Sequence, residues 1–170
     1  MKKIIFSKAL TVFFLLIVIG VKAQTTPGGT SYTTAVGLKF GGYEDGVSVK
    51  YFNSSDVSYE GVLGFRDHGV VVTGLYELNQ EAFNVPELKF YYGFGAHIGA
   101  EGRGVYDRFD GSNEYYDSGH LLLGLDGVIG LEYKIPQSPI AISLDLNPRI
   151  ELASGPYFDL APGLGLKYTF

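Results

Sequence analysis

The chain of 170 residues contains no cysteine, no tryptophan and a single methionine. The absence of cysteine excludes structural disulfides, thiol catalysis, cysteine-based zinc sites and a lipid anchor attached through a thiol. Basic residues are also scarce. Of the 13 Lys and Arg, four lie in the first 23 residues, whereas all 18 Asp and Glu come later, so the remainder has a net charge of −9. This charge disfavours nucleic acid as a partner, because phosphate binding needs basic surface, and no motif indicates a cofactor.

The N-terminus has the layout of a secretory signal peptide. Lys2 and Lys3 form a basic start, an apolar run covers residues 9–21, and Ala23 supplies a small residue at the cleavage position. The run is too short for a membrane-spanning helix, which needs about 20 apolar residues. We therefore expect residues 1–23 to be cleaved after export through the Sec pathway.

Alternation of apolar residues with small or polar ones dominates the rest of the chain. Residues 24–32, rich in Thr, Gly and Ser, are predicted to form a flexible periplasmic lead-in, and residues 33–170 to form one domain. The high counts of Gly and of Tyr plus Phe, 24 and 25, suit a β-protein with aromatic girdles. The alternating segments lie at 36–41, 47–51, 57–65, 70–78, 88–99, 121–134, 140–152 and 162–170. These segments predict eight strands and no helix.

An even number of strands places both chain ends on the same side of a barrel. With the ends on the periplasmic side, the predicted extracellular connections are 41–46, 66–69, 100–119 and 153–157. The predicted periplasmic turns are 53–56, 79–87 and 135–139.

Alternation alone leaves open which face points outward. A soluble, lipocalin-like barrel would direct its apolar side chains inward, around a ligand. However, the interior of an eight-stranded barrel is only just wide enough for side chains. Gly, Ser and charged residues fit such an interior, whereas a ring of Leu, Ile, Phe and Tyr would overfill it. We therefore predict that the apolar face points outward, into lipid.

The last nine residues alternate regularly and end on an aromatic residue, Phe170. This strand resembles the C-terminal signal of outer-membrane β-barrels, and the chain from Thr33 to Phe170 is similar to the small barrels of the OmpA and OmpX type. The resemblance implies an all-β fold, namely an eight-stranded antiparallel up-and-down transmembrane β-barrel. It also implies a monomer in the outer membrane of a Gram-negative bacterium, in contact with outer-membrane lipid and lipopolysaccharide. Insertion by the barrel-assembly machinery would use Leu164, Leu166, Tyr168 and Phe170.

The inner face carries charges of both signs. If the turn at 136–139 pairs Lys134 with Ala141, then Asp126 lies opposite Arg149, and Asp159 lies within diagonal reach. Arg149 would then bridge two carboxylates. We predict an ion-pair plug in the lumen, with these candidates: Asp126, Arg149, Asp159, Glu132 and Lys134. A narrow gated pore would use the same residues and remains an alternative.

The longest predicted loop, 100–119, mixes acidic and aromatic residues. It offers candidates for contact with an extracellular protein or glycan, giving an adhesin-like role: Arg103, Tyr106, Arg108, Phe109, Tyr115 and Tyr116. Its acidic residues leave open a divalent cation, although their spacing matches no EF-hand.

A lipid-modifying enzyme is the third alternative. Its general base would be His120, which follows Asp117 and Ser118. The sequence lacks the His-x-Ser pair of lipid A deacylases, and we expect no enzymatic activity.

Overall fold

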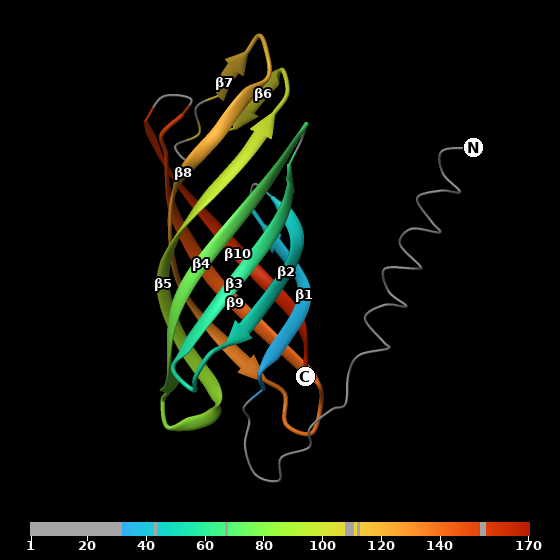
Figure 1. The fold of residues 1–170 in the computed structure, drawn as a ribbon, viewed down its shortest axis with the longest axis vertical. Coiled ribbons are helices and arrows are strands. Elements are labelled where there is room, and N and C mark those ends of the chain that lie inside the picture. The colour runs from blue at the N-terminus through green and yellow to red at the C-terminus, as the bar shows by residue number, and fades with distance from the viewer. Residues whose placement is uncertain (1–31, 43, 67, 108–110, 112, 154–155) are drawn as a thin grey trace, which may run out of the picture.

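The computed structural model describes residues 32–42, 44–66, 68–107, 111, 113–153 and 156–170. The expected signal peptide, 1–23, and residues 24–31 of the expected lead-in lie outside the described residues. Eight strands close into an antiparallel barrel in the order β1-β10-β9-β8-β5-β4-β3-β2 (Figure 1). The predicted fold class, an eight-stranded up-and-down barrel, is confirmed. Among the described residues no helix is long and apolar enough to cross a membrane.

The barrel strands follow one another along the chain, apart from a small hairpin inserted between β5 and β8. The barrel strands are β1 (Thr34–Gly41), β2 (Asp45–Phe52), β3 (Val57–Arg66), β4 (Gly69–Ala82), β5 (Val85–Glu101), β8 (His120–Lys134), β9 (Ile140–Glu151) and β10 (Tyr157–Thr169). The inserted hairpin consists of β6 (Gly104–Asp107) and β7 (Asn113–Tyr116). We call the end that carries this hairpin the upper end and the end that carries the C-terminus the lower end (Figure 1).

The first and last strands close the barrel by pairing with each other. Val36 pairs with Tyr168 and Phe40 with Leu164. At the lower end, the Phe170 amide donates to the Thr34 carbonyl at 2.8 Å, and the Thr33 amide donates to the Phe170 carbonyl at 3.0 Å. Closure leaves the barrel without a free edge strand, which is how such sheets satisfy their backbone groups.

The apolar side chains point outward. Along β8, for example, Leu125 is 56% exposed, whereas its neighbour Asp126 is 4% exposed. The same alternation runs through the other barrel strands, so small and charged residues line the lumen and bulky apolar ones cover the outside. The prediction of an outward apolar face is confirmed, and the lipocalin-like alternative is wrong. Some apolar side chains also face inward, and three of them, Leu75, Tyr91 and Val128, form a small cluster.

Two predicted connections differ from the structure. Strands β4 and β5 continue through the predicted 79–87 loop and are joined by a turn at Phe83 and Asn84, whose φ angles are 55° and 57°. Two successive positive φ angles are typical of the tight type I′ hairpin turn. The end of β4 does not follow the alternation of apolar and polar residues, because Gln80 and Glu81 are both polar and exposed and the register shifts between Glu81 and Ala82. The predicted loop 100–119 also contains regular structure, since β6 and β7 pair within it.

Candidate functional site: charge networks inside the barrel

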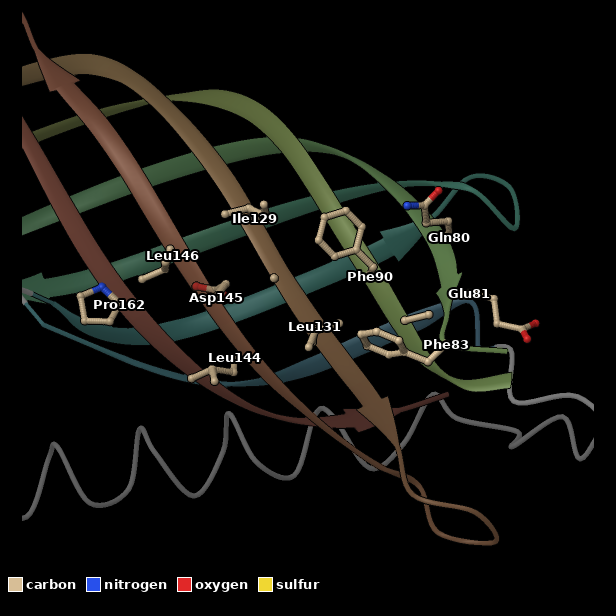
Figure 2. Close-up of a pocket in the computed structure, with 12 residues that line it drawn as sticks. Gln80, Glu81, Phe83, Phe90, Ile129, Leu131, Leu144, Asp145, Leu146 and Pro162 are labelled. Atoms are coloured by element: carbon tan, nitrogen blue, oxygen red, sulfur yellow. The ribbon is translucent and has the colours of Figure 1, made fainter. Parts of the chain in front are cut away.

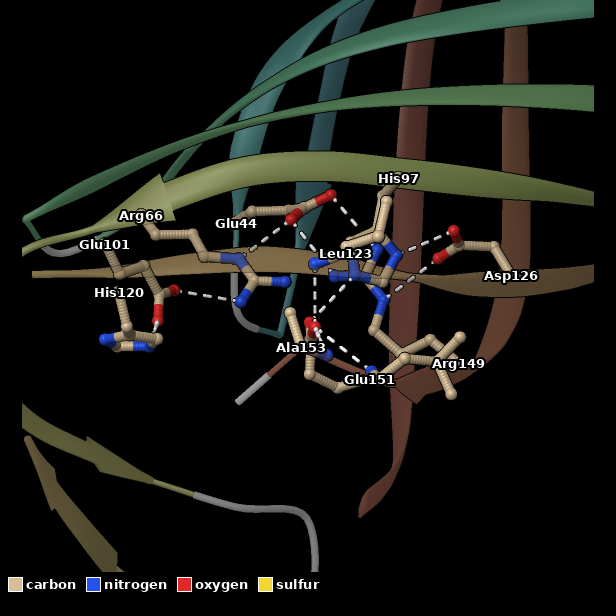
Figure 3. A network of polar contacts seen from close by, with 11 residues as sticks. Glu44, Arg66, His97, Glu101, His120, Leu123, Asp126, Arg149, Glu151 and Ala153 are labelled. Atoms are coloured by element: carbon tan, nitrogen blue, oxygen red, sulfur yellow. Dashed lines mark hydrogen bonds and ion pairs between the residues drawn. The ribbon is translucent and has the colours of Figure 1, made fainter. Parts of the chain in front are cut away.

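The charged side chains of the lumen form two networks. The upper network contains Glu44, Arg66, His97, Glu101, His120, Asp126, Arg149 and Glu151 (Figure 3). The lower network contains Tyr32, Lys50, Ser58, Glu60, Glu77, Asn79, Glu132 and Lys167. Most of these groups are buried from solvent, so their charges depend on one another.

Arg149 lies at the centre of the upper network. On the barrel wall it pairs in register with Asp126 on β8 and with Asp159 on β10. Its Nε lies 3.2 Å from Asp126 Oδ1. Its Nη1 and Nη2 donate to the two carboxylate oxygens of Glu44 at 3.2 and 3.3 Å. Arg149 therefore bridges Asp126 and Glu44, a residue that sequence reasoning missed because it precedes β2 within a connection, where strand alternation gives no signal.

Glu44 also links the network to the upper rim. Arg66 Nε donates to Glu44 Oε2 at 3.0 Å, and its Nη1 donates to Glu101 Oε1 at 2.9 Å. His120 Nε2 lies 3.4 Å from Glu101 Oε2. Burial by itself raises the pKa of Glu44, but attraction by Arg149 and Arg66 outweighs it and lowers the pKa to about 2. Glu44 is therefore an ionised carboxylate between two guanidinium groups.

His97 occupies a fully buried position between two carboxylates. Its Nδ1 lies 2.8 Å from Asp126 Oδ2 and its Nε2 lies 2.9 Å from Glu151 Oε2. The ring lies against Gly124, where an added Cβ would come within 2.5 Å of His97 Cε1. The alternation placed His97 on the inner face, but only the register of β5, β8 and β9 brings these three side chains together.

The lower network surrounds two lysines with three glutamates. Lys50 Nζ lies 3.0 Å from Glu77 Oε2 and 3.5 Å from Glu132 Oε2. Lys167 Nζ lies 2.9 Å from Glu60 Oε1 and 3.3 Å from Glu132 Oε2. Glu132 was a predicted member of the plug, and its cationic neighbours come from β2 and β10, which the sequence could not place beside it.

Lys134, also a plug candidate, takes a different position. Its Nζ donates to the carbonyl oxygens of Ser138 and Ile135 in the lower turn between β8 and β9. Its backbone pairs with Ala141, as the predicted register requires.

Tyr32, the last residue of the expected lead-in, also lies at the lower end of the lumen. Its ring packs edge-on against Phe52, with the centroids 5.0 Å apart, and its hydroxyl donates to Glu132. The ring thus covers the lower network from below.

Side chains also fill the lumen between the two networks. Lys39 Nζ lies 3.2 Å from Asp145 Oδ2, and the Tyr91 hydroxyl donates to the same oxygen at 2.7 Å. A cavity of about 20 Å³ lies beside Lys39, Asn147 and Arg149, which is room for about one water molecule.

The β6–β7 hairpin packs on the upper end through aromatic contacts. Tyr116 stacks on His120, with the ring centroids 3.8 Å apart, and Tyr106 meets His120 edge-on at 5.7 Å. Val105 and Tyr115 pair across the hairpin and are each 59% exposed. Of the predicted contact candidates, Arg103 and Tyr115 are exposed, whereas Tyr106 and Tyr116 are partly buried against His120. Arg108 and Phe109 lie outside the described residues.

The histidine proposed for enzymatic chemistry has partners that differ from the expected ones. His120 contacts Glu101 and two tyrosine rings, while Asp117 and Ser118 are exposed on the connection before it. Within the described part of the chain, no group of three or more His, Asp and Glu side chains is arranged to hold a metal ion.

The outer wall also has a hollow, of about 720 Å³, across β5, β8, β9 and β10 (Figure 2). Phe83 stands at its edge, and the outward side chains of Phe90, Leu131 and Leu144 line it. The hollow belongs to the apolar outside of the barrel and brings together no set of polar groups that could perform catalysis.

The barrel resembles solved structures of known proteins. The N-terminal β-barrel domain of Pseudomonas aeruginosa OprF superposes with a TM-score of 0.63 at 18% sequence identity, covering 82% of this chain and 100% of that domain. Neisserial surface protein A (NspA) superposes with a TM-score of 0.49 at 12% identity, covering 81% of this chain and 94% of that protein. The likeness to the OprF barrel establishes a shared fold. No protein-family model and no curated protein sequence matches the chain.

Proposed function

We propose that this chain is a monomeric integral protein of the Gram-negative outer membrane, with its lumen closed to ions and with a surface-interaction role at its upper end. The observation that carries the proposal is the contrast between the inner and outer faces of the barrel wall. Charged side chains fill the narrow lumen in two paired networks, while bulky apolar side chains stand exposed on the outside. A soluble protein would have no physical reason to expose so many large apolar side chains.

Aromatic residues at both ends of the outer wall support the membrane location. Tyr51, Tyr59, Tyr133 and Tyr168 stand outward towards the lower end, and Phe40, Phe65 and Phe158 stand outward towards the upper end. Aromatic girdles at the two interfaces are typical of outer-membrane barrels. Between them the wall would contact outer-membrane lipid and lipopolysaccharide. The leader at 1–23 would direct export through the Sec pathway, and the barrel-assembly machinery would insert the chain.

Fractionation tests the location. We expect the chain in the outer-membrane fraction, with a shift in gel mobility between unboiled and boiled samples, because a closed barrel keeps its compact shape in detergent until it is heated. Recovery as a soluble periplasmic protein would contradict the proposal.

Planar-bilayer recording tests the closed lumen. Purified chain in a lipid bilayer at neutral pH should give no resolved channel steps, because ion pairs fill the upper and lower lumen and Tyr32 covers the lower network. Steady steps at neutral pH would favour the second candidate, a narrow gated pore. One observation favours that candidate: Arg149 divides its contacts between Asp126 on the wall and Glu44 on a connection, and the small cavity lies beside it.

The β6–β7 hairpin is the proposed contact surface for an extracellular protein or glycan. Its outer face presents Val105 and Tyr115, and exposed tyrosines are frequent anchors at interfaces. Deleting residues 103–117 should abolish attachment of cells to protein-coated or glycan-coated surfaces, while the heat-dependent gel shift remains. The paired substitution Val105→Ser and Tyr115→Ser is the smaller test, and the matched control is Phe83→Ser, an exposed apolar residue at the opposite end. Unchanged attachment after the deletion would exclude this role.

A further inference from the structure

The contacts of His97 determine where its protons lie. Both ring nitrogens are within 2.9 Å of a carboxylate oxygen, Nδ1 beside Asp126 and Nε2 beside Glu151. An ionised carboxylate only accepts hydrogen bonds, and a neutral imidazole has one donor nitrogen and one acceptor nitrogen. The two short contacts are therefore compatible only with an extra proton, either on the second ring nitrogen or on one of the carboxylates.

Other contacts place that proton on the ring. Glu151 Oε1 accepts from three backbone amides, those of Leu123 at 2.7 Å and of Leu152 and Ala153 at 3.2 Å each. Backbone amides only donate, so they favour an ionised Glu151. Asp126 Oδ1 lies 3.2 Å from the guanidinium of Arg149, which favours an ionised Asp126 in the same way. His97 is therefore the donor in both contacts.

The surroundings of His97 favour a cation at this point. The upper network has four carboxylates and two guanidinium groups. The second imidazole, His120, contacts Glu101 near the rim. From β8 and β9, Asp126, Glu151 and Arg149 face His97; Glu44 and Arg66 extend the network from the β1–β2 connection and from β3 (Figure 3). The neighbour on β4 is the uncharged Thr73.

We propose that the doubly protonated His97 is a pH-sensitive latch that joins β5, β8 and β9 and keeps the upper lumen closed. The proposal rests on the closed lumen proposed above. When the pH rises, His97 loses one ring proton to the solvent and becomes neutral. One ring nitrogen then presents a lone pair to a carboxylate less than 3 Å away, and the two repel each other. The ring then moves away from Asp126. Asp126 no longer holds Arg149 in a fixed position, and the lumen admits ions.

Nitrogen-15 NMR of histidine-labelled chain in detergent micelles tests the protonation state directly. Free histidine added to the sample serves as the reference. At about pH 7.5 an unperturbed imidazole is mostly neutral, whereas His97 should give the signals of two protonated nitrogens. Neutral-ring signals from His97 at that pH would overturn the proposal.

Conductance across a pH series tests the consequence. The native chain should be closed at about pH 7 and should show a several-fold rise in conductance at the pH where the NMR signals of His97 change to the neutral form. His97→Gln, which cannot carry the cation, should conduct at neutral pH and show no such rise. His68→Gln is the matched control, because His68 is exposed in the β3–β4 connection and belongs to neither network, and it should retain the response. The gel shift checks that each variant folds.

The two proposals fail in different ways. A native chain that conducts at neutral pH while His97 is doubly protonated contradicts the closed lumen and with it the latch. A native chain that is closed at neutral pH and stays closed after His97 loses its proton contradicts the latch alone. Because both measurements use the native chain, the test stands even if His97→Gln does not fold.

Discussion

Arg149 on β9 donates hydrogen bonds to Glu44 on the β1–β2 connection from both terminal nitrogens of its guanidinium, which lie 3.2 and 3.3 Å from the two carboxylate oxygens. The two residues are 105 positions apart in the sequence. This bidentate contact turns the Glu44 side chain into the lumen, where Arg66 also reaches it. The connection between β1 and β2 thereby contributes a side chain that helps to close the upper end of the lumen.

Removing the guanidinium should open and destabilise the barrel. Arg149→Gln leaves Glu44 and Asp126 without their shared cation, and breaking a buried ion pair by removing one partner costs about 3–5 kcal/mol. We expect a lower urea midpoint for unfolding from lipid vesicles and new channel steps in planar bilayers. Arg103→Gln, on the exposed flank of the hairpin, is the control and should change neither. A closed and fully stable Arg149→Gln barrel would show that the plug does not depend on this residue.

Glu44 should make the stability depend on pH in the acidic range. Its pKa in the folded protein, about 2, lies below the ordinary value of 4.5, so its stabilisation is complete above about pH 4.5 and is lost as the pH falls towards 2. A shift of this size corresponds to roughly 3 kcal/mol. The difference in unfolding free energy between native chain and Glu44→Gln should therefore be of that order at pH 7 and should shrink across this window. Glu81→Gln, which removes an exposed carboxylate at the lower end, is the control and should change the unfolding free energy little at pH 7.

The wall of the barrel could be predicted from the sequence because alternation has a period of two and a narrow lumen leaves one choice of faces. The pairing of Asp126 with Arg149 followed from one short turn, which fixes the register of β8 and β9. Contacts between neighbouring strands joined by a short turn could therefore be predicted from the sequence.

The contacts across the lumen could not be predicted. Lys167 reaches Glu60 from β10 to β3, strands that are not neighbours in the sheet. Such a contact depends on barrel closure and strand tilt, which no local pattern encodes. Glu44 and Tyr32 were missed for a related reason, since both lie outside the regular alternation and enter the lumen from segments that read as loops.

The contribution of the lower network to the stability of the barrel should depend on its charge balance more than on any single ion pair. Lys167→Met would remove the ammonium group that pairs with both Glu60 and Glu132, and we expect a loss of about 3–5 kcal/mol in unfolding free energy. Adding Glu60→Gln to this variant removes one uncompensated carboxylate and should restore a large part of the loss. Denaturant titration of the single and double variants measures the difference. If the double variant is less stable than Lys167→Met, the charge-balance explanation is wrong.

Two neighbouring glycines on opposite faces of the wall test how tightly the lumen is filled. At Gly95, which faces inward, an added Cβ would overlap the carbonyl oxygen of Gly74 and lie 2.9 Å from Leu75 Cδ2. At Gly74, which faces outward, an added Cβ would have no neighbour within 4 Å. Gly95→Ala should therefore lower the stability by about 1–3 kcal/mol or more, whereas Gly74→Ala should have little effect. Equal effects at the two positions would contradict the assignment of the faces.

The terminal aromatic residue should matter more for assembly than for the stability of the assembled barrel. The Phe170 ring packs only against Tyr168 among the ring contacts of the described chain, with the centroids 4.9 Å apart. Closure instead uses the Phe170 backbone, which exchanges hydrogen bonds with Thr33 and Thr34. Phe170→Ser keeps these bonds, so purified and refolded variant should unfold close to the native midpoint.

In cells, by contrast, the same variant should reach the outer membrane in reduced amount if the barrel-assembly machinery reads the side chains of the last strand. Quantifying the heat-shifted band in outer-membrane fractions measures this yield, with Phe158→Ser as the control, since Phe158 is an exposed aromatic near the upper end of the same strand. If Phe170→Ser is unstable after refolding and is also poorly assembled in cells, the role of Phe170 is packing in the barrel. Normal yield of Phe170→Ser would remove it from the assembly signal, and the alternation of Leu164, Leu166 and Tyr168 would then have to carry that signal without a terminal aromatic.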